Sequence, residues 1–133
     1  MKTTAQEIES AKRAIIDCHI VNEQNKTYPS EFNGYISSFG ASLVQAGLLP
    51  TIIFFENSDS NAEEDRTKVI YALKKMLGIA DNTNMANYIL SKENNAPIRR
   101  CDDPAYINKV VKAMTAMKLA LRMFNKKNNI NNA

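Results

Sequence analysis

The sequence has few of the residues that build catalytic and metal-binding centres. Its single histidine, His19, is accompanied by no serine or cysteine motif, and Cys18 and Cys101 lack metal-ligand spacing. P-loop, Gly-x-Gly-x-x-Gly, His-Glu-x-x-His and EF-hand patterns are also missing. We expect reduced, mostly buried thiols, no cofactor, no metal and no enzyme; an enzymatic reading would need a hidden acid or base such as His19 or Glu64.

Charge is missing from a long internal segment. Between Phe32 and Phe55 the chain has no Asp, Glu, Lys, Arg or His, although 23% of all residues are Asp, Glu, Lys or Arg. Such a segment must leave water, for a core, a membrane or a partner. Interrupting polar residues and Pro50 argue against one membrane-spanning helix, and the N-terminus does not resemble a signal peptide. We expect a cytoplasmic protein with these aromatic side chains at the centre of its core.

Helical periodicity dominates the remaining sequence and predicts an all-α fold. We expect about six helices in a single compact bundle without a β-sheet. Residues 1–127 are predicted to form one domain, because a chain of 133 residues can bury a sufficient core without cross-links. Residues 128–133 are predicted to be an Asn-rich tail that frays.

Capping signals mark the first two helices. Thr4 and Glu7 form a capping-box pattern, and the apolar spacing that follows predicts a helix to about Asn22. The second helix is expected to follow Ser30 as N-cap and to end at Gly47, which can adopt a left-handed conformation.

Similar signals mark the next three helices. Pro50 is predicted at the first position of the third helix. Ser60 and Glu63 form a capping-box pattern for the fourth helix, and Gly78 is expected to end it. A shorter fifth helix is predicted over residues 83–92.

The last helix has the most regular pattern, with Asp103 as N-cap, Pro104 at its first position and an apolar stripe reaching Phe124. Further apolar side chains project away from this stripe. Either a neighbouring helix of the same domain covers them or they form a protein interface. The candidate interface residues are Ala116, Leu119, Ala120 and Met123. Beyond Phe124 the polar residues have little to bury and are expected to fray.

Positive charge is concentrated at the C-terminal end. Residues 1–96 contain nine basic and twelve acidic side chains, whereas residues 97–133 contain eight basic and two acidic ones. The second segment therefore has a net charge of about +6 and the first about −3. Cations of one sign along a helix attract phosphate polyanions without specifying a sequence. The ordinary alternative is that these lysines only keep an exposed helix soluble.

Two motifs in the charge-free segment resemble a known family. The sequence Tyr35-Ile36-Ser37, followed by Gly47-Leu48-Leu49-Pro50-Thr51-Ile52-Ile53-Phe54-Phe55, is similar to the signature of the small subunit of type III-B CRISPR (Cmr) effector complexes. The resemblance extends more loosely through the first helix, with Lys12 and Arg13, to the final helix.

This resemblance implies a non-catalytic subunit of an antiviral ribonucleoprotein. Several copies would stack along backbone subunits that carry the guide RNA and would hold target RNA against it. The implied partners are guide RNA, target RNA, the backbone and polymerase-like effector subunits, and neighbouring copies of the chain, with no membrane.

Together, the basic pattern and the resemblance favour RNA binding through phosphate contacts. The predicted contact residues are Lys12, Arg13, Arg99, Arg100, Lys109, Lys112, Arg122 and Lys126. The alternative is a helical protein-interaction module, such as an adaptor or antitoxin-like protein, that does not bind nucleic acid.

Overall fold

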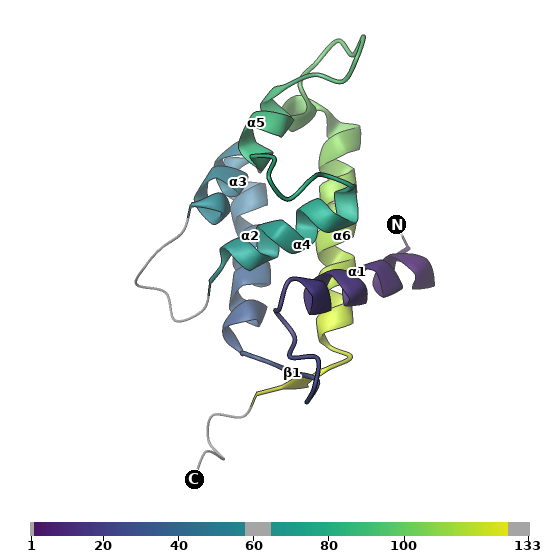
Figure 1. Cartoon of the computed structure of the whole chain (residues 1–133). Helices are drawn as coiled ribbons and strands as arrows, with labels where there is room; N and C mark the ends of the chain where they lie inside the picture. Colours follow the sequence, from purple (N-terminus) through teal and green to yellow (C-terminus); the bar gives the residue numbers. More distant parts are fainter. Residues whose placement is uncertain (1, 58–64, 128–133) are drawn as a thin grey trace.

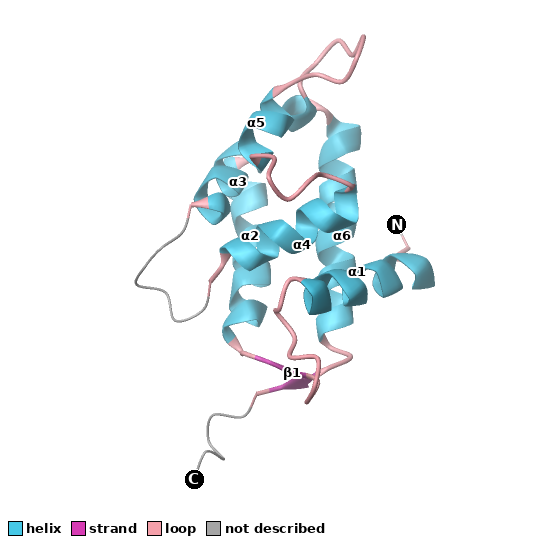
Figure 2. Cartoon of the chain, in the orientation of Figure 1, coloured by secondary structure: helices cyan, strands magenta, loops and turns pink. Residues whose placement is uncertain are grey.

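The computed structural model describes residues 2–57 and 65–127 and contains six α-helices in these ranges (Figures 1 and 2). They are α1 (Ala5–Asp17), α2 (Glu31–Ala46), α3 (Leu48–Glu56), α4 (Thr67–Leu77), α5 (Met85–Leu90) and α6 (Pro104–Leu121). A short 3-10 helix, η1 (Arg100–Asp102), precedes α6. The predicted all-α class is confirmed.

Helix α1 begins as expected and ends earlier than expected. The Thr4 hydroxyl accepts from the backbone N–H of Glu7 at 3.1 Å, and the Glu7 carboxylate accepts from that of Thr4 at 2.8 Å. The helix stops at Asp17 because His19 is left-handed, with φ of 63°, and the Ile20 N–H bonds back to the Ile15 carbonyl. This termination lets the chain turn and bury Ile20, which is 1% exposed.

Gly47 separates α2 from α3 and holds a backbone conformation of φ 96°, ψ 172° that disfavours a side chain. Helix α3 begins at Leu48, so the prediction that Pro50 is its first residue is wrong by two positions. A proline fits there because N–H groups in the first helical turn have no intrahelical partner. The buried Thr51 hydroxyl donates to the Gly47 carbonyl at 2.8 Å and lies 2.7 Å from the Ser42 hydroxyl.

The predictions for the start of α2 and the extent of α5 also differ from the structure in detail, and one prediction for α4 is untested. Ser30 precedes α2 but makes no side-chain capping bond. The predicted capping box of Ser60 and Glu63 lies outside the described residues, and α4 begins at Thr67. Helix α5 is shorter than predicted because Asn84 caps its start and the chain becomes extended at Ser91.

Helix α6 matches its prediction at the N-terminus. The Asp103 carboxylate accepts from the Ala105 N–H at 3.0 Å, and Pro104 occupies the first position. This helix runs along the molecule and contacts α1, α2, α4 and η1 (Figure 1). Because neighbours cover several of its sides, α6 is the central helix of the fold.

The core is one cluster of buried apolar side chains that all six α-helices supply. Phe39 of α2 and Phe55 of α3 pack edge to face with ring centroids 5.3 Å apart. Phe32 is fully buried as well, but Phe54 is 56% exposed, so only part of the charge-free segment lies at the centre. Within the described part of the chain, no helix is both long enough and apolar enough to cross a membrane.

A two-residue parallel strand pair departs from the expectation that no β-structure is present. Strand β1 (Thr27–Tyr28) pairs with β2 (Asn125–Lys126). The Asn125 N–H donates to the Lys26 carbonyl at 3.1 Å, and the Lys127 N–H donates to the Tyr28 carbonyl at 2.8 Å. The expectation that the chain frays directly after Phe124 is therefore wrong for residues 125–127. The rest of the predicted tail, 128–133, lies outside the described residues.

Candidate nucleic-acid interface

A groove of about 450 Å³ lies between the first turns of α2 and the last turns of α6. It is lined by Tyr28, Asn33, Ile36, Ser37, Lys118, Arg122, Phe124, Asn125 and Lys126. Three of these side chains are cations and none is acidic. A groove with charges of one sign and low-dielectric walls concentrates anions.

Local structure places the three cations together. Lys118 and Arg122 are four residues apart at the end of α6, so they project from the same side of the helix. Lys126 reaches the groove because its strand pairs with Tyr28, just ahead of α2. All three side chains are exposed, and no ion pair joins them to a carboxylate among the residues that the structure describes.

Polar groups from α2 supplement the cations. Asn33 and Ser37 lie one turn apart on the opposite wall of the groove. The Asn33 amide donates to the Tyr28 hydroxyl at 3.4 Å, and its other groups remain available. Amides and hydroxyls contact phosphate and sugar oxygens in nucleic-acid complexes, so this wall suits the same ligand as the cations.

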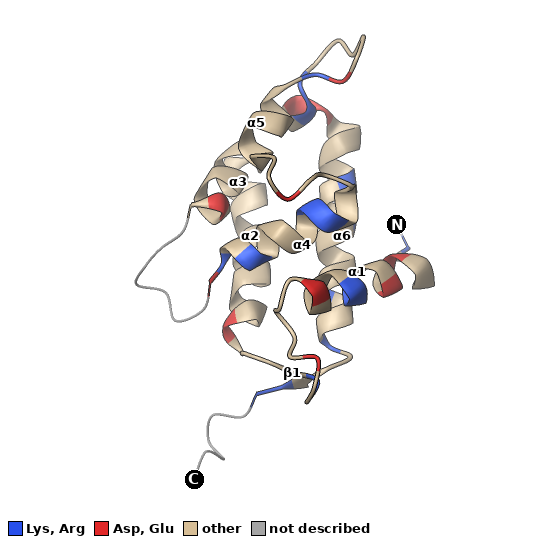
Figure 3. Ribbon diagram, viewed as in Figure 1, with Lys and Arg blue, Asp and Glu red and all other residues tan. Residues whose placement is uncertain are grey.

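The other predicted contact residues are dispersed over the molecule (Figure 3). Arg13 on α1 and Arg99 before η1 are exposed. The Lys12 ammonium lies 5.9 Å from the centroid of the Phe124 ring, near the groove. Lys112 pairs with Glu7 at 3.6 Å, and Lys109 lies 6.0 Å from the centroid of another aromatic ring, that of Tyr106.

Arg100 serves the fold instead of an exposed surface. Its Nη1 atom donates to the Tyr88 carbonyl at 3.1 Å and to the Ser91 hydroxyl at 2.8 Å. Its guanidinium also stacks 4.0 Å from the centroid of the Tyr88 ring, and its side chain is 13% exposed. A side chain held in this way is less available to a phosphate backbone than the exposed Arg99, so the contact predicted for Arg100 is the least favoured of the set.

The predicted interface residues divide into two pairs. Ala116 and Ala120 are fully buried, which contradicts their assignment to an interface. Lys112 and Phe124 lie one turn before Ala116 and one turn after Ala120, on the same side of the α6 region. Both contact α1, so α1 covers the two alanines. Leu119 is half-buried and Met123 is 61% exposed, so both can still contact a partner.

Lys118 is absent from the predicted contact residues although the structure gives it a central place in the groove. Its spacing of four residues from Arg122 is the sequence signal that could have included it. Tyr28 and Asn33 offered no comparable signal, because they join the groove only through the pairing of β1 with β2 and the packing of α2 beside α6.

The structure locates most of the residues considered for metal binding or catalysis. They contain no group of three His, Cys, Asp or Glu side chains that could hold a metal ion. His19 is exposed in the turn after α1, and Glu64 lies outside the described residues. Cys18 and Cys101 are free and half-buried, and burial raises the pKa of both thiols, which disfavours the nucleophilic thiolate.

Comparison with protein families agrees with the motif in the charge-free segment. Residues 6–126 match the family model described as CRISPR-associated protein (Cas_Cmr5). The chain belongs to the Cmr5 family. Members of this family are subunits of the type III-B Cmr effector complex. Comparisons of this Cmr5-family chain with curated proteins and with solved structures give no match.

The structure shows where the residues of the family signature lie. In this Cmr5-family chain, residues 47–55 of the signature form the Gly47 elbow and most of α3 and line no part of the basic groove, whereas Ile36 and Ser37, from its first part, do line the groove. Leu48, Ile52 and Phe55 from the signature are buried in the core. Residues 47–55 therefore maintain the fold, and the cations that could meet a polyanion are found on other elements.

Proposed function

We propose that this Cmr5-family chain is a non-catalytic structural subunit that contacts RNA phosphates in a cytoplasmic type III-B effector complex. The observation that carries this proposal is the convergence of Lys118, Arg122 and Lys126 on one groove without an acidic lining residue. Three unpaired cations release counterions when they bind a polyanion, and this favours association without reading bases.

The wider role follows from the family and from this groove. Copies of the chain stack along the backbone subunits, and each holds target RNA and guide in place through phosphate contacts. Lys12, Arg13 and Arg99 lie outside the lining of the groove and supply weaker contacts. The charge of Lys112 is partly neutralised by its ion pair with Glu7. Cleavage and signalling chemistry belong to other subunits.

Neighbouring subunits dock on exposed apolar side chains. Met123 and Leu119 lie at the end of α6, and α3 exposes Ile53 by 51% and Phe54 by 56%. Exposed apolar side chains of this size are a common feature of protein interfaces. Met123→Glu and Ile53→Glu should each reduce incorporation into the assembled complex, while Ala80→Glu, a change at another exposed site, should leave it unchanged.

Salt dependence tests the RNA contact. The triple variant Lys118→Gln, Arg122→Gln, Lys126→Gln should weaken binding of a labelled single-stranded RNA. It should also reduce the slope of log affinity against log salt by about 2, since each phosphate contact contributes roughly 0.7. Sequence preference should not change.

A charge-matched control separates this groove from general positive charge. Lys2→Gln, Lys75→Gln, Lys92→Gln removes three exposed cations elsewhere and should leave most of the slope intact. Equal effects of both triple variants would reject the groove. Unchanged RNA binding by the groove variant would favour the alternative, a helical interaction module that uses only its apolar faces.

A further inference from the structure

Two adjoining cavities on the opposite side of α6 share Glu93, Tyr106 and Lys109. One has a volume of about 230 Å³ and the other about 430 Å³. Together they lie among α1, the end of α4, α5, the loop before η1 and the first turns of α6. We call this combined space the Tyr106 pocket. None of the groove cations lines it, so it is a separate site.

The Tyr106 pocket contains hydrogen-bonding groups without partners. Tyr106 is 7% exposed, and among the described residues its hydroxyl makes no hydrogen bond. The Nε atom of Arg100 is buried and also lacks an acceptor, although Glu93 lies 3.9 Å away. Buried polar groups usually find partners, and leaving them unpaired costs stability. Arg100 Nε is the buried unpaired group here, whereas the Tyr106 hydroxyl is accessible from the cavity and can donate to a ligand there.

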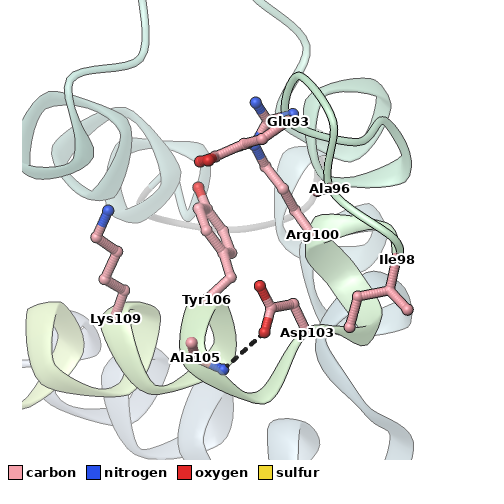
Figure 4. A pocket seen from close by; sticks show the side chains of 8 residues that line it. All are labelled: Glu93, Ala96, Ile98, Arg100, Asp103, Ala105, Tyr106 and Lys109. Carbon is pink, nitrogen blue, oxygen red and sulfur yellow. Dashed lines mark hydrogen bonds and ion pairs between the residues drawn. The ribbon is translucent and has the colours of Figure 1, made fainter.

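Figure 4 shows how these groups face the cavity. The Tyr106 hydroxyl and the Glu93 carboxylate point toward the same part of the space, and the Lys109 ammonium lies to one side. Burial raises the pKa of Tyr106 to about 12, with Tyr88 adding to the effect, so the hydroxyl is a neutral donor at physiological pH. The Glu93 carboxylate is the complementary acceptor.

The walls of the larger cavity suit a flat ring. Tyr88 and Tyr106 provide aromatic surface, and Met76, Leu77 and Ala113 provide apolar surface. Lys109 and Lys112 lie on the same wall and can meet a phosphate. The carboxylates of Glu7 and Glu93 disfavour a bare polyanion, so a ligand with a heterocycle as well as a phosphate fits better.

We propose that the Tyr106 pocket binds a single nucleotide whose base carries an exocyclic amino group. The base stacks against the tyrosine-lined wall and its amino group donates to Glu93. Tyr106 donates to an acceptor on the ring, and Lys109 with Lys112 contacts the phosphate. Aromatic stacking with hydrogen bonds to base edges is the usual mode of recognition for unpaired bases. The occupant is either a free nucleotide or one unpaired nucleotide of a strand.

Nuclear magnetic resonance titrations of the full chain test this assignment with matched ligands. CMP and UMP differ at an amino or carbonyl group, and AMP and IMP differ in the same way. We expect saturable shifts at Tyr106 and Lys109, with CMP and AMP binding roughly 5-fold or more tighter than UMP and IMP. Inorganic phosphate alone should not reproduce the shifts.

Two conservative variants assign the roles. Tyr106→Phe keeps the ring and should weaken all four nucleotides, whereas Glu93→Gln should reduce the preference for amino-bearing bases. Lys126→Gln, in the basic groove, should leave nucleotide binding unchanged. Unchanged circular dichroism would establish that each variant remains folded.

The source of the nucleotide is decided by comparing CMP and AMP with short single-stranded RNAs of C or A. Saturation by mononucleotides assigns a free ligand, and shifts produced only by the RNAs assign a nucleotide within a strand. Either result supports the pocket if amino-bearing bases are preferred. No shift with any ligand, equal binding of CMP and UMP, or the same shifts from phosphate alone would overturn it. Tyr106 does not line the basic groove, so Tyr106→Phe should leave salt-dependent RNA binding unchanged. A negative nucleotide titration would therefore reject the Tyr106 pocket without rejecting the RNA contact in the groove.

Discussion

The ammonium group of Lys74 donates hydrogen bonds to the carbonyl oxygens of Asp81, at 2.9 Å, and Thr83, at 3.0 Å. Lys74 is only 4% exposed, and its nitrogen also lies 4.5 Å from the centroid of the Tyr71 ring. No carboxylate forms an ion pair with it among the described residues. Backbone carbonyls and an aromatic ring thus stabilise this buried charge. The two hydrogen bonds in turn connect α4 to the turn between α4 and α5.

Lys74→Met should destabilise the protein by about 2–3 kcal/mol, since two carbonyls lose a charged donor. The free energy of unfolding, measured by urea titration, checks this value. Lys75→Met changes the exposed neighbouring lysine and should be nearly neutral. Equal effects of the two substitutions would mean that the Lys74 bonds contribute no net stability.

Glu56→Ala should leave two backbone N–H groups at the start of α5 without their acceptor. The Glu56 carboxylate, from the end of α3, accepts from the backbone N–H of Met85 and, at 3.0 Å, from that of Ala86. Loss of this cap should cost about 1–2 kcal/mol. Hydrogen exchange at those two amides should accelerate, while Glu9→Ala, at an exposed site on α1, should leave them protected.

Gly47→Ala should destabilise the elbow between α2 and α3 by about 1–3 kcal/mol because a Cβ disfavours its backbone conformation. Gly40→Ala is the matched control. Gly40 lies within α2, where a Cβ meets no atom within 4 Å, so this change should stabilise by roughly 0.5–1 kcal/mol. Thermal unfolding of the two variants should therefore shift in opposite directions.

Acidification should weaken the start of α1. Hydrogen bonds from the backbone and hydroxyl of Thr4, with a smaller contribution from Lys112, lower the pKa of Glu7 below its usual value. The unfolded chain therefore binds this proton more readily, and the contribution of Glu7 is present above its unfolded pKa and lost as pH falls through the folded one.

Glu7→Gln should accordingly reduce the dependence of stability on pH over the acidic range below about pH 5. Urea titrations at neutral and acidic pH measure it, and Glu9→Gln on the exposed face of α1 is the control. An identical pH profile for Glu7→Gln and the unchanged protein would contradict a coupled carboxylate.

Helix starts were predictable where one local signal determines them. The capping pattern of Thr4 with Glu7 and the Asp103-Pro104 pair each act within a single turn, and both are confirmed. Helix ends were less predictable. The α1 pattern continues past Asp17, yet the helix stops because turning at His19 allows the next two residues to be buried, a gain that depends on the rest of the fold.

The candidate site was predictable only in part. The excess of C-terminal positive charge is plain in the sequence, and Arg122 and Lys126 were named from it. Which cations meet in one groove depends on the pairing of β1 with β2, whose two-residue strands produce no alternation that a sequence pattern could reveal. Arg100 looked equivalent to Arg99, but the Tyr88 ring and nearby carbonyls hold it inside.

By itself, the sequence determined the all-α class, the charge-free elbow around Gly47 and the family signature, because periodicity, capping and turn chemistry act over a few neighbouring residues. Tertiary structure alone decided that Ala116 and Ala120 are buried beside α1 while Lys118 opens into the groove. The periodicity of a helix determines which side chains project from the same side of it. Which neighbour covers that side depends on contacts between distant segments, and local pattern carries no information about those contacts.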